Sequence, residues 1–224
     1  MPGFGFYRPS GQALQAPSEQ AHALASSITA YTGDPLVRTI ISSNYVVRPL
    51  TQTEITAAYA SGGNTYGILG YNPNAWITDS SGIATSQPAP SGVLGNVQVR
   101  FNLPTIDFAQ SDAVTGRSMA SVPIFSTDML ISGYLWETTT VTENLKGTPV
   151  GILLSTVNSV PYFYWSSAAT TKVGIIKAVS IDDPFFNKTV SANVQDTSNA
   201  SRCQIGVEML AAYCQADSQY TYAG

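Results

Sequence analysis

The chain has 224 residues and a globular composition, with 44% apolar residues, a net charge of −4 and only 11% charged residues. Ordinary soluble proteins carry roughly a quarter charged residues, so uncharged polar residues must form much of this surface, which other subunits can cover at little desolvation cost. The ten basic residues are scattered, so we expect no direct nucleic-acid binding, and no apolar run approaches the ~18 residues of a membrane-spanning helix, so we expect no membrane segment.

Residues 1–27 are predicted to form an extended N-terminal arm. The stretch "PGFGFYRPSG" is rich in Gly, Pro and aromatic residues, and it fits neither a long helix nor a central strand. On a free monomer Phe4, Phe6 and Tyr7 would be exposed, which favours an arm that docks on another protein. The alternative is that the arm folds back over its own body.

Residues 26–42 contain two β-rich segments joined by "TGDP" at 32–35. In this turn Gly33 permits a positive φ, the carboxylate of Asp34 can accept a backbone hydrogen bond, and Pro35 fixes the exit direction. The pattern predicts a structural corner at the start of the β-body, without a catalytic role for Asp34.

Turn residues recur at short intervals along the rest of the chain, with no β-α-β rhythm. Residues 51–60 are ambiguous between helix and strand, residues 203–215 fit neither period, and residues 112–123 are predicted to form a loop. The other predicted strands are 44–50, 65–71, a hairpin over 75–85, 93–103, two between 123 and 142, 150–157, 158–167, 172–181 and 188–194. This succession is typical of an all-β fold, and it predicts a β-barrel or β-sandwich body over residues 28–224.

The only histidine, His22, lies in the predicted arm. A nucleophilic triad would need it in a rigid site, so a surface or packing role is favoured. Together with Cys203 and Cys214 it does not supply a usual zinc ligand set, so we expect neither a metal nor a cofactor. The two cysteines are expected to be reduced core thiols, with a disulfide as the alternative.

The carboxylates also lack a catalytic motif. Asp182 and Asp183 precede Pro184, and this order favours a structural turn. Asp107 and Asp112 flank a loop, and a glycosidase-like pair that the fold brings together stays open as an alternative.

An aromatic run at 162–165, "YFYW", offers two interpretations. It could form a platform that stacks on sugars, or it could pack in the core or against a subunit. Alternate residues of a strand face opposite sides, so packing is favoured, and the same role is expected of Trp76 and Trp136.

Two motifs, "YTGDPLVR" at 31–38 and "TYGILGYN" at 65–72, resemble a group of tailed-phage virion proteins, the small β-barrel capsid decoration or cement proteins. The matching elements are Tyr31–Leu36, Gly67–Gly70 and Ile181–Pro184. The resemblance implies a non-enzymatic protein that binds and stabilises the phage head by bridging major capsid proteins. It also implies a homo-oligomer, often a trimer, that is assembled in the host cytoplasm and lies on the capsid surface of the virion.

In this interpretation the arm carries the capsid-binding residues Phe4, Phe6, Tyr7 and Arg8. Three alternatives remain at this point. The first is a receptor-binding or glycan-binding fibre or spike module, the second is a sandwich-type enzyme of carbohydrate metabolism, and the third is a minor capsid shell protein.

Overall fold

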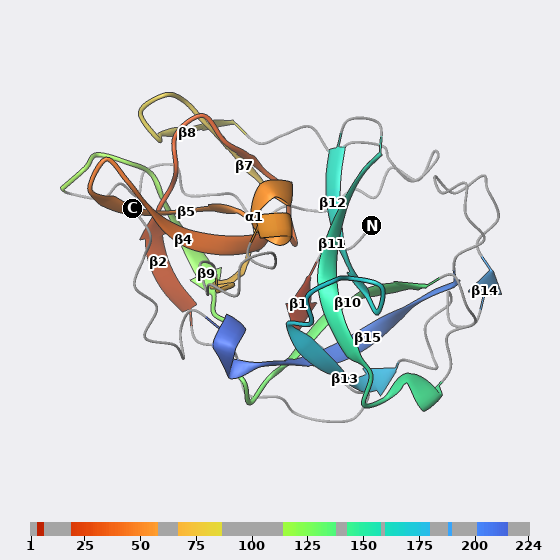
Figure 1. The fold of residues 1–224 in the computed structure, drawn as a ribbon. Coiled ribbons are helices and arrows are strands. Elements are labelled where there is room, and N and C mark those ends of the chain that lie inside the picture. Colours follow the sequence, from red (N-terminus) through yellow and green to blue (C-terminus); the bar gives the residue numbers. More distant parts are fainter. Residues whose placement is uncertain are drawn as a thin grey trace.

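A computed structural model describes most of the chain and shows a predominantly β protein (Figure 1). The described part contains one short α-helix and two 3-10 turns, and the remaining regular elements are strands, which confirms the predicted all-β class. The described residues are 4–6, 19–57, 67–86, 114–137, 143–157, 160–179, 188–189 and 201–214.

Five strands from the second half of the chain close into a small barrel. Around the ring they are β10 (Leu130–Glu137), β12 (Val160–Ser166), β11 (Pro149–Val157), β13 (Gly174–Val179) and β15 (Ser201–Met209). Strand β15 then pairs with β10 over the whole length of β10, which closes the ring. All neighbours are antiparallel except β10 and β12, which meet in parallel.

Two very short strands extend this barrel at its edges. Strand β1 (Gly5–Phe6) pairs with β10, and β14 (Lys188–Thr189) pairs with β15. The 3-10 turns η1 (Glu143–Leu145) and η2 (Ala211–Tyr213) precede β11 and follow β15. Residues 203–215, which fit neither period, therefore begin as strand and continue as a 3-10 turn.

The described residues between 19 and 125, called the first half below, form a second circuit of strands. The members are β2 (Glu19–Ala23), β5 (Asn44–Pro49), β4 (Pro35–Ile41), β6 (Gly70–Tyr71) and β9 (Met119–Pro123). Ladders join β2 to β9, β5 to β4 and β4 to β6. Single bridges between Leu24 and Val47 and between Gly70 and Ile124 complete the circuit.

A three-stranded sheet and the helix lie beside this circuit. The sheet contains β3 (Thr29–Ala30), β7 (Trp76–Thr78) and β8 (Ala84–Ser86), of which β7 and β8 form the predicted hairpin. Helix α1 (Gln52–Ala57) lies between the two halves and contacts β11 (Figure 1). The ambiguous segment 51–60 therefore begins as a helix.

The two halves share one apolar core. Val37, Leu50 and Phe125 from the first half belong to the same buried cluster as the inward-facing side chains of the barrel. A second cluster around Trp76 fills the first half alone. The shared cluster makes the two halves a single packed body.

Several sequence predictions are confirmed, and one is wrong. Strands over 36–42, 44–50 and 150–157 occur as β4, β5 and β11. The loop predicted for 112–123 is wrong at its second half, which forms β9 because β2 pairs with it. Of the two strands expected between 123 and 142, β10 lies in the described part, and 138–142 and the strand predicted over 93–103 lie outside it.

The β-body also begins earlier than residue 28. Strand β2 pairs with β9 from Glu19 to Ala23. These residues were assigned to the arm because they have little apolar character, whereas their partner strand supplies the hydrogen bonds. The arm predicted over 1–27 therefore includes part of the sheet structure.

Candidate functional site

The turn at residues 32–35 is a buried corner. Gly33 has a positive φ of 85°, as the sequence predicted. The Tyr31 N–H donates a 2.8 Å hydrogen bond to the carboxylate of Asp34, and the Asp34 N–H donates to the Tyr31 carbonyl at 3.1 Å. Pro35 begins β4, so all three residues have the structural role expected of them.

Asp34 is only 4% exposed, although it is an acidic residue. Burial raises the pKa of Asp34 to about 7, and the hydrogen bond from the Tyr31 N–H opposes this rise. Within the described part of the chain no cation pairs with this carboxyl group. The corner therefore contains a group that changes its protonation near neutral pH.

Asn72, which directly follows β6, forms hydrogen bonds with the corner through its backbone and its side chain. The Gly33 N–H donates to the Asn72 carbonyl at 2.7 Å, and the Asn72 N–H donates to the Asp34 carbonyl at 2.8 Å. The Asn72 side chain donates to the Tyr31 carbonyl at 3.1 Å and accepts from the Trp76 indole N–H at 3.2 Å. Sequence reasoning missed this residue, because its partners at the corner lie about forty positions away along the chain.

The N-terminal segment meets the same corner. The Phe4 N–H donates to the Gly33 carbonyl at 2.8 Å, and Gly5–Phe6 pairs with β10. The Phe4 side chain is 3% exposed and meets the Trp165 ring edge-on, with 4.8 Å between ring centroids. Residues 4–6 therefore fold back over the protein's own body.

This result corrects one predicted capsid-binding residue. Phe4 was expected to be an exposed anchor, but it is buried because a pocket of the barrel accepts its ring. The side chain of Phe6, and Tyr7 and Arg8 as a whole, lie outside the described residues.

The aromatic run follows the packing interpretation. Trp165 is fully buried and Phe163 nearly so, while Tyr164, which alternates with them, is half-buried. Trp76 is fully buried as well. The faces of Phe163 and Trp165 are therefore covered by protein and cannot stack on a sugar.

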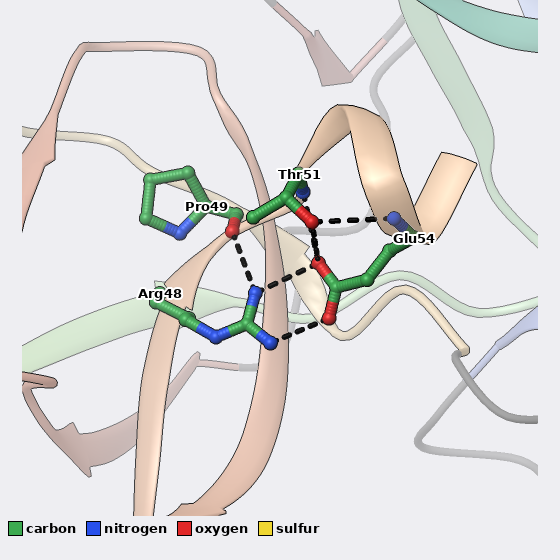
Figure 2. A network of polar contacts seen from close by, with 4 residues as sticks. All are labelled: Arg48, Pro49, Thr51 and Glu54. Atoms are coloured by element: carbon green, nitrogen blue, oxygen red, sulfur yellow. Dashed lines mark hydrogen bonds and ion pairs between the residues drawn. The ribbon is translucent and has the colours of Figure 1, made fainter. Parts of the chain in front are cut away.

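A second polar cluster joins β5 to helix α1 (Figure 2). The guanidinium of Arg48 donates to both carboxylate oxygens of Glu54, at 2.7 and 2.5 Å, and also to the Pro49 carbonyl at 3.2 Å. Thr51 and Glu54 cap the helix reciprocally: the Thr51 N–H donates to Glu54, and the Glu54 N–H donates to the Thr51 hydroxyl. The "TQTE" spacing of a capping box is the sequence signal that could have revealed this cluster.

Glu54 is ionised in this cluster despite being buried. Burial by itself would raise the pKa of Glu54, but the hydrogen bonds and charge of Arg48 and the hydrogen bonds from Thr51 outweigh it, and the pKa is lowered. The ion pair therefore lies within the protein and holds α1 beside β5.

His22 lies on β2 beside the sheet that carries Arg38 and Tyr45. Burial, with the positive charge of Arg38, lowers the pKa of His22 to about 4, so it is neutral at physiological pH. Its Nε2 atom is buried and has no hydrogen-bond partner in the described part of the chain. This fits the packing role that the sequence favoured over catalysis.

The β4–β5 hairpin presents apolar side chains to solvent. Ile41 is 36% exposed and Tyr45 is 56% exposed, with the guanidinium carbon of Arg38 5.8 Å from the centroid of the Tyr45 ring. Ile83 and Val114 are the other large exposed apolar side chains among the described residues.

Other predicted residues lie outside the described part of the chain. These are Asp182, Asp183 and Pro184 of the predicted turn, and Asp107 and Asp112 of the acidic loop. Among the described residues no group of three or more His, Cys, Asp or Glu side chains is arranged to hold a metal ion. Cys214 is a buried thiol at the end of η2, and the side chain of Cys203 lies outside the description.

Comparison with known proteins gives no relative. No known family, no curated protein and no solved structure matches the chain. None of the helices in the described ranges has the length and apolar character that crossing a bilayer requires.

The two polar clusters described here hold segments of the protein together. The corner joins the N-terminal segment, β4 and Asn72, and the Arg48–Glu54 pair joins β5 to α1. These hydrogen bonds fix the geometry of the segments that they join.

Proposed function

We propose that this chain is a structural virion protein, a capsid decoration or cement protein that binds a phage head and stabilises it by bridging major capsid proteins. The observation that carries the proposal is the corner at residues 32–35. The residues that resemble decoration proteins are the same residues that join three segments of an all-β body. In this proposal the protein is not an enzyme and needs no cofactor.

The surface supports contact with a repeating protein lattice. Only 11% of the residues are charged, so a capsid can cover this surface with a small desolvation cost. Because Phe4 is buried, we assign the docking role to the exposed hairpin residues Ile41 and Tyr45, together with Tyr7 and Arg8 of the arm. Weak single contacts become strong when several copies bind one lattice, which agrees with the proposed homo-oligomer, a trimer.

The alternative function is a receptor-binding or glycan-binding fibre or spike module. Burial of Phe163 and Trp165 removes these two rings of the aromatic run from a sugar platform and weakens this alternative. Tyr45 is the exposed aromatic residue that could still contact a glycan, and a glycan array tests it directly.

The test of the proposed function is the copy number of the protein on purified virus particles. Quantitative mass spectrometry should find a stoichiometry near that of the major capsid protein. A few copies per particle would favour a spike, and absence from particles would refute the proposal.

A matched pair of variants then locates the docking surface. We expect the double variant Ile41→Ser/Tyr45→Ser to bind particles at least tenfold more weakly, because central apolar anchors carry most of the binding free energy of an interface. Ile83→Ser, an equally exposed residue on another hairpin, is the control and should bind normally. Equal binding by both variants would exclude the β4–β5 hairpin as the docking surface.

A further inference from the structure

We propose that the pocket that holds Phe4 is an acceptor site for the N-terminal strand of a second copy of this chain. In this arrangement β1 of each copy pairs with β10 of the next copy around a closed ring of copies. The inference does not rest on the proposed function, since it concerns only the barrel and the segment that fills it.

Two barrel strands supply the contacts of the Phe4 ring, which belongs to the core cluster that the two halves share. These strands are β10 and β12, and Trp165 provides the aromatic edge against which the Phe4 ring packs at 4.8 Å. Gly133 provides the space: a Cβ atom at this position would lie 2.7 Å from the Phe4 ring and 2.5 Å from the Trp165 indole nitrogen. Even a methyl group would clash at this position, so glycine at 133 leaves the space that the Phe4 ring occupies.

The edge of β10 provides the second half of the acceptor site. Strand β12 pairs with β10 at Leu135. Strand β1 pairs with the same β10 further along, with Gly5 opposite Ser132 and Phe6 opposite Ile131. If β1 left, Ile131 and Ser132 of β10 would lose their strand partner on this edge. An unpaired strand edge recruits an extended segment readily.

The connection is long enough for exchange. Twelve residues, 7–18, separate β1 from β2, and twelve extended residues reach about 40 Å. A globular chain of 224 residues has a diameter of roughly the same size. Donor and acceptor are identical in every copy, so the exchanged form keeps the same strand and pocket contacts, and exchange is favoured wherever copies are concentrated.

A cross-linking experiment tests the exchange in the full chain. Gly5→Cys and Ser132→Cys are made in separate chains that carry tags of different mass, mixed, and held under oxidising conditions. Because these positions are register partners, we expect a disulfide-linked heterodimer at least tenfold above that of a control mixture. The control combines Gly5→Cys with Ser121→Cys, which lies on β9 at an exposed position.

Two further measurements keep the test decisive. The double variant Gly5→Cys/Ser132→Cys in one chain should form the link and establish its geometry. If it forms the link within single chains while the mixture gives no heterodimer, the proposal is wrong. Sedimentation of the unmodified chain over a range of concentrations should show an oligomer that Phe4→Ala abolishes, and a monomer at every concentration would also overturn the proposal.

Discussion

The two halves of the molecule reach the same result, a closed circuit of five strands, by different means. In the barrel every residue of β10 pairs with β15, and β11 pairs with β12 along most of its length. In the first half β6 has two residues, and single bridges at Leu24 and Gly70 close the circuit. Backbone ladders therefore hold the barrel, whereas the first half needs other connections.

Polar side chains supply those connections. The Thr78 hydroxyl accepts from the Ile28 N–H and donates to the Ala25 carbonyl, at 3.0 and 2.7 Å. The guanidinium of Arg117 donates to the Leu24 carbonyl at 3.0 Å, and the Ser118 hydroxyl accepts from a backbone N–H of β8. Where strands are too short to satisfy their own backbone, buried side chains that bond to it take over this task.

Glycine is used differently in the two halves as well. In the first half, a Cβ at Gly70 would lie 1.9 Å from the Pro123 carbonyl oxygen, so glycine allows β6 to approach the end of β9. In the barrel, Gly133 opens a side-chain pocket. Gly70 therefore allows two backbone segments to approach closely, whereas Gly133 leaves space for the aromatic ring of Phe4.

The largest expected effect comes from the packing of the barrel. Trp165→Ala removes a fully buried ring that contacts Phe4, and we expect the free energy of unfolding to fall by about 3–5 kcal/mol. Denaturant titration measures the change, and Ile83→Ala on the exposed β7–β8 hairpin is the control. If Trp165→Ala lowered the free energy of unfolding no more than Ile83→Ala does, packing around Trp165 would not be a main source of the stability of the barrel.

Next comes the pH dependence of the corner. The pKa of Asp34 is raised to about 7, so its stabilising contribution is complete below the unfolded pKa and is lost as pH rises through 7. Each pH unit between about 4 and 7 costs up to ~1.4 kcal/mol, and the whole window up to ~4 kcal/mol. Asp34→Asn keeps the shape without the titration, so the stability of the variant relative to the original chain should increase from pH 4 to pH 8.

Both Asp34→Asn and the original chain contain all the other titrating groups, so the contributions of those groups cancel in the stability difference. A stability difference that is constant over this pH range would refute the raised pKa of Asp34.

Breaking the ion pair of the first half should have a somewhat smaller effect. Arg48→Met leaves Glu54 buried without its partner, which costs about 3 kcal/mol by analogy with other buried pairs. The pKa of Glu54 is lowered by Arg48, so in the variant this carboxyl takes up a proton more readily and the deficit should shrink toward pH 4. The double variant Arg48→Met/Glu54→Leu should be more stable than Arg48→Met at pH 7, and the opposite order would contradict a buried pair.

The smallest effect tests a single polar connection. Asn72→Ala removes one of the two donors to the Tyr31 carbonyl and leaves the buried Trp76 N–H without its acceptor, with an expected loss of about 2 kcal/mol in the free energy of unfolding. Asn44→Ala removes an exposed amide that bonds only to a neighbouring turn carbonyl, and it should change the stability much less. Equal losses would show that the corner does not depend on Asn72.

The sequence predicted the parts whose cause is local. Strands β4, β5 and β11 follow from β-branched runs bounded by turn residues, and the geometry of Gly33, Asp34 and Pro35 follows from the residue types themselves. The capping box of Thr51 and Glu54 belongs to this class too, because its spacing is visible in the chain.

Other features had no local cause. Strand β9 is a short segment without a clear strand pattern that becomes a strand because β2 lies beside it. By its residue type Asn72 is expected at the surface, but it is buried because it bonds to the corner. Phe4 was expected to be exposed because its stretch is rich in Gly and Pro and fits neither a long helix nor a central strand. Its ring instead packs beside Gly133 and Trp165, which lie more than a hundred positions away.

The sequence alone therefore determined the all-β class, the positions of most strands and the corner, since propensity and turn chemistry act over a few residues. Only the tertiary structure decided which strands close into circuits, where the charged and polar side chains are buried, and where the N-terminal segment lies. These depend on contacts between distant parts of the chain, because the free energy of burial belongs to the assembled core and not to any one segment.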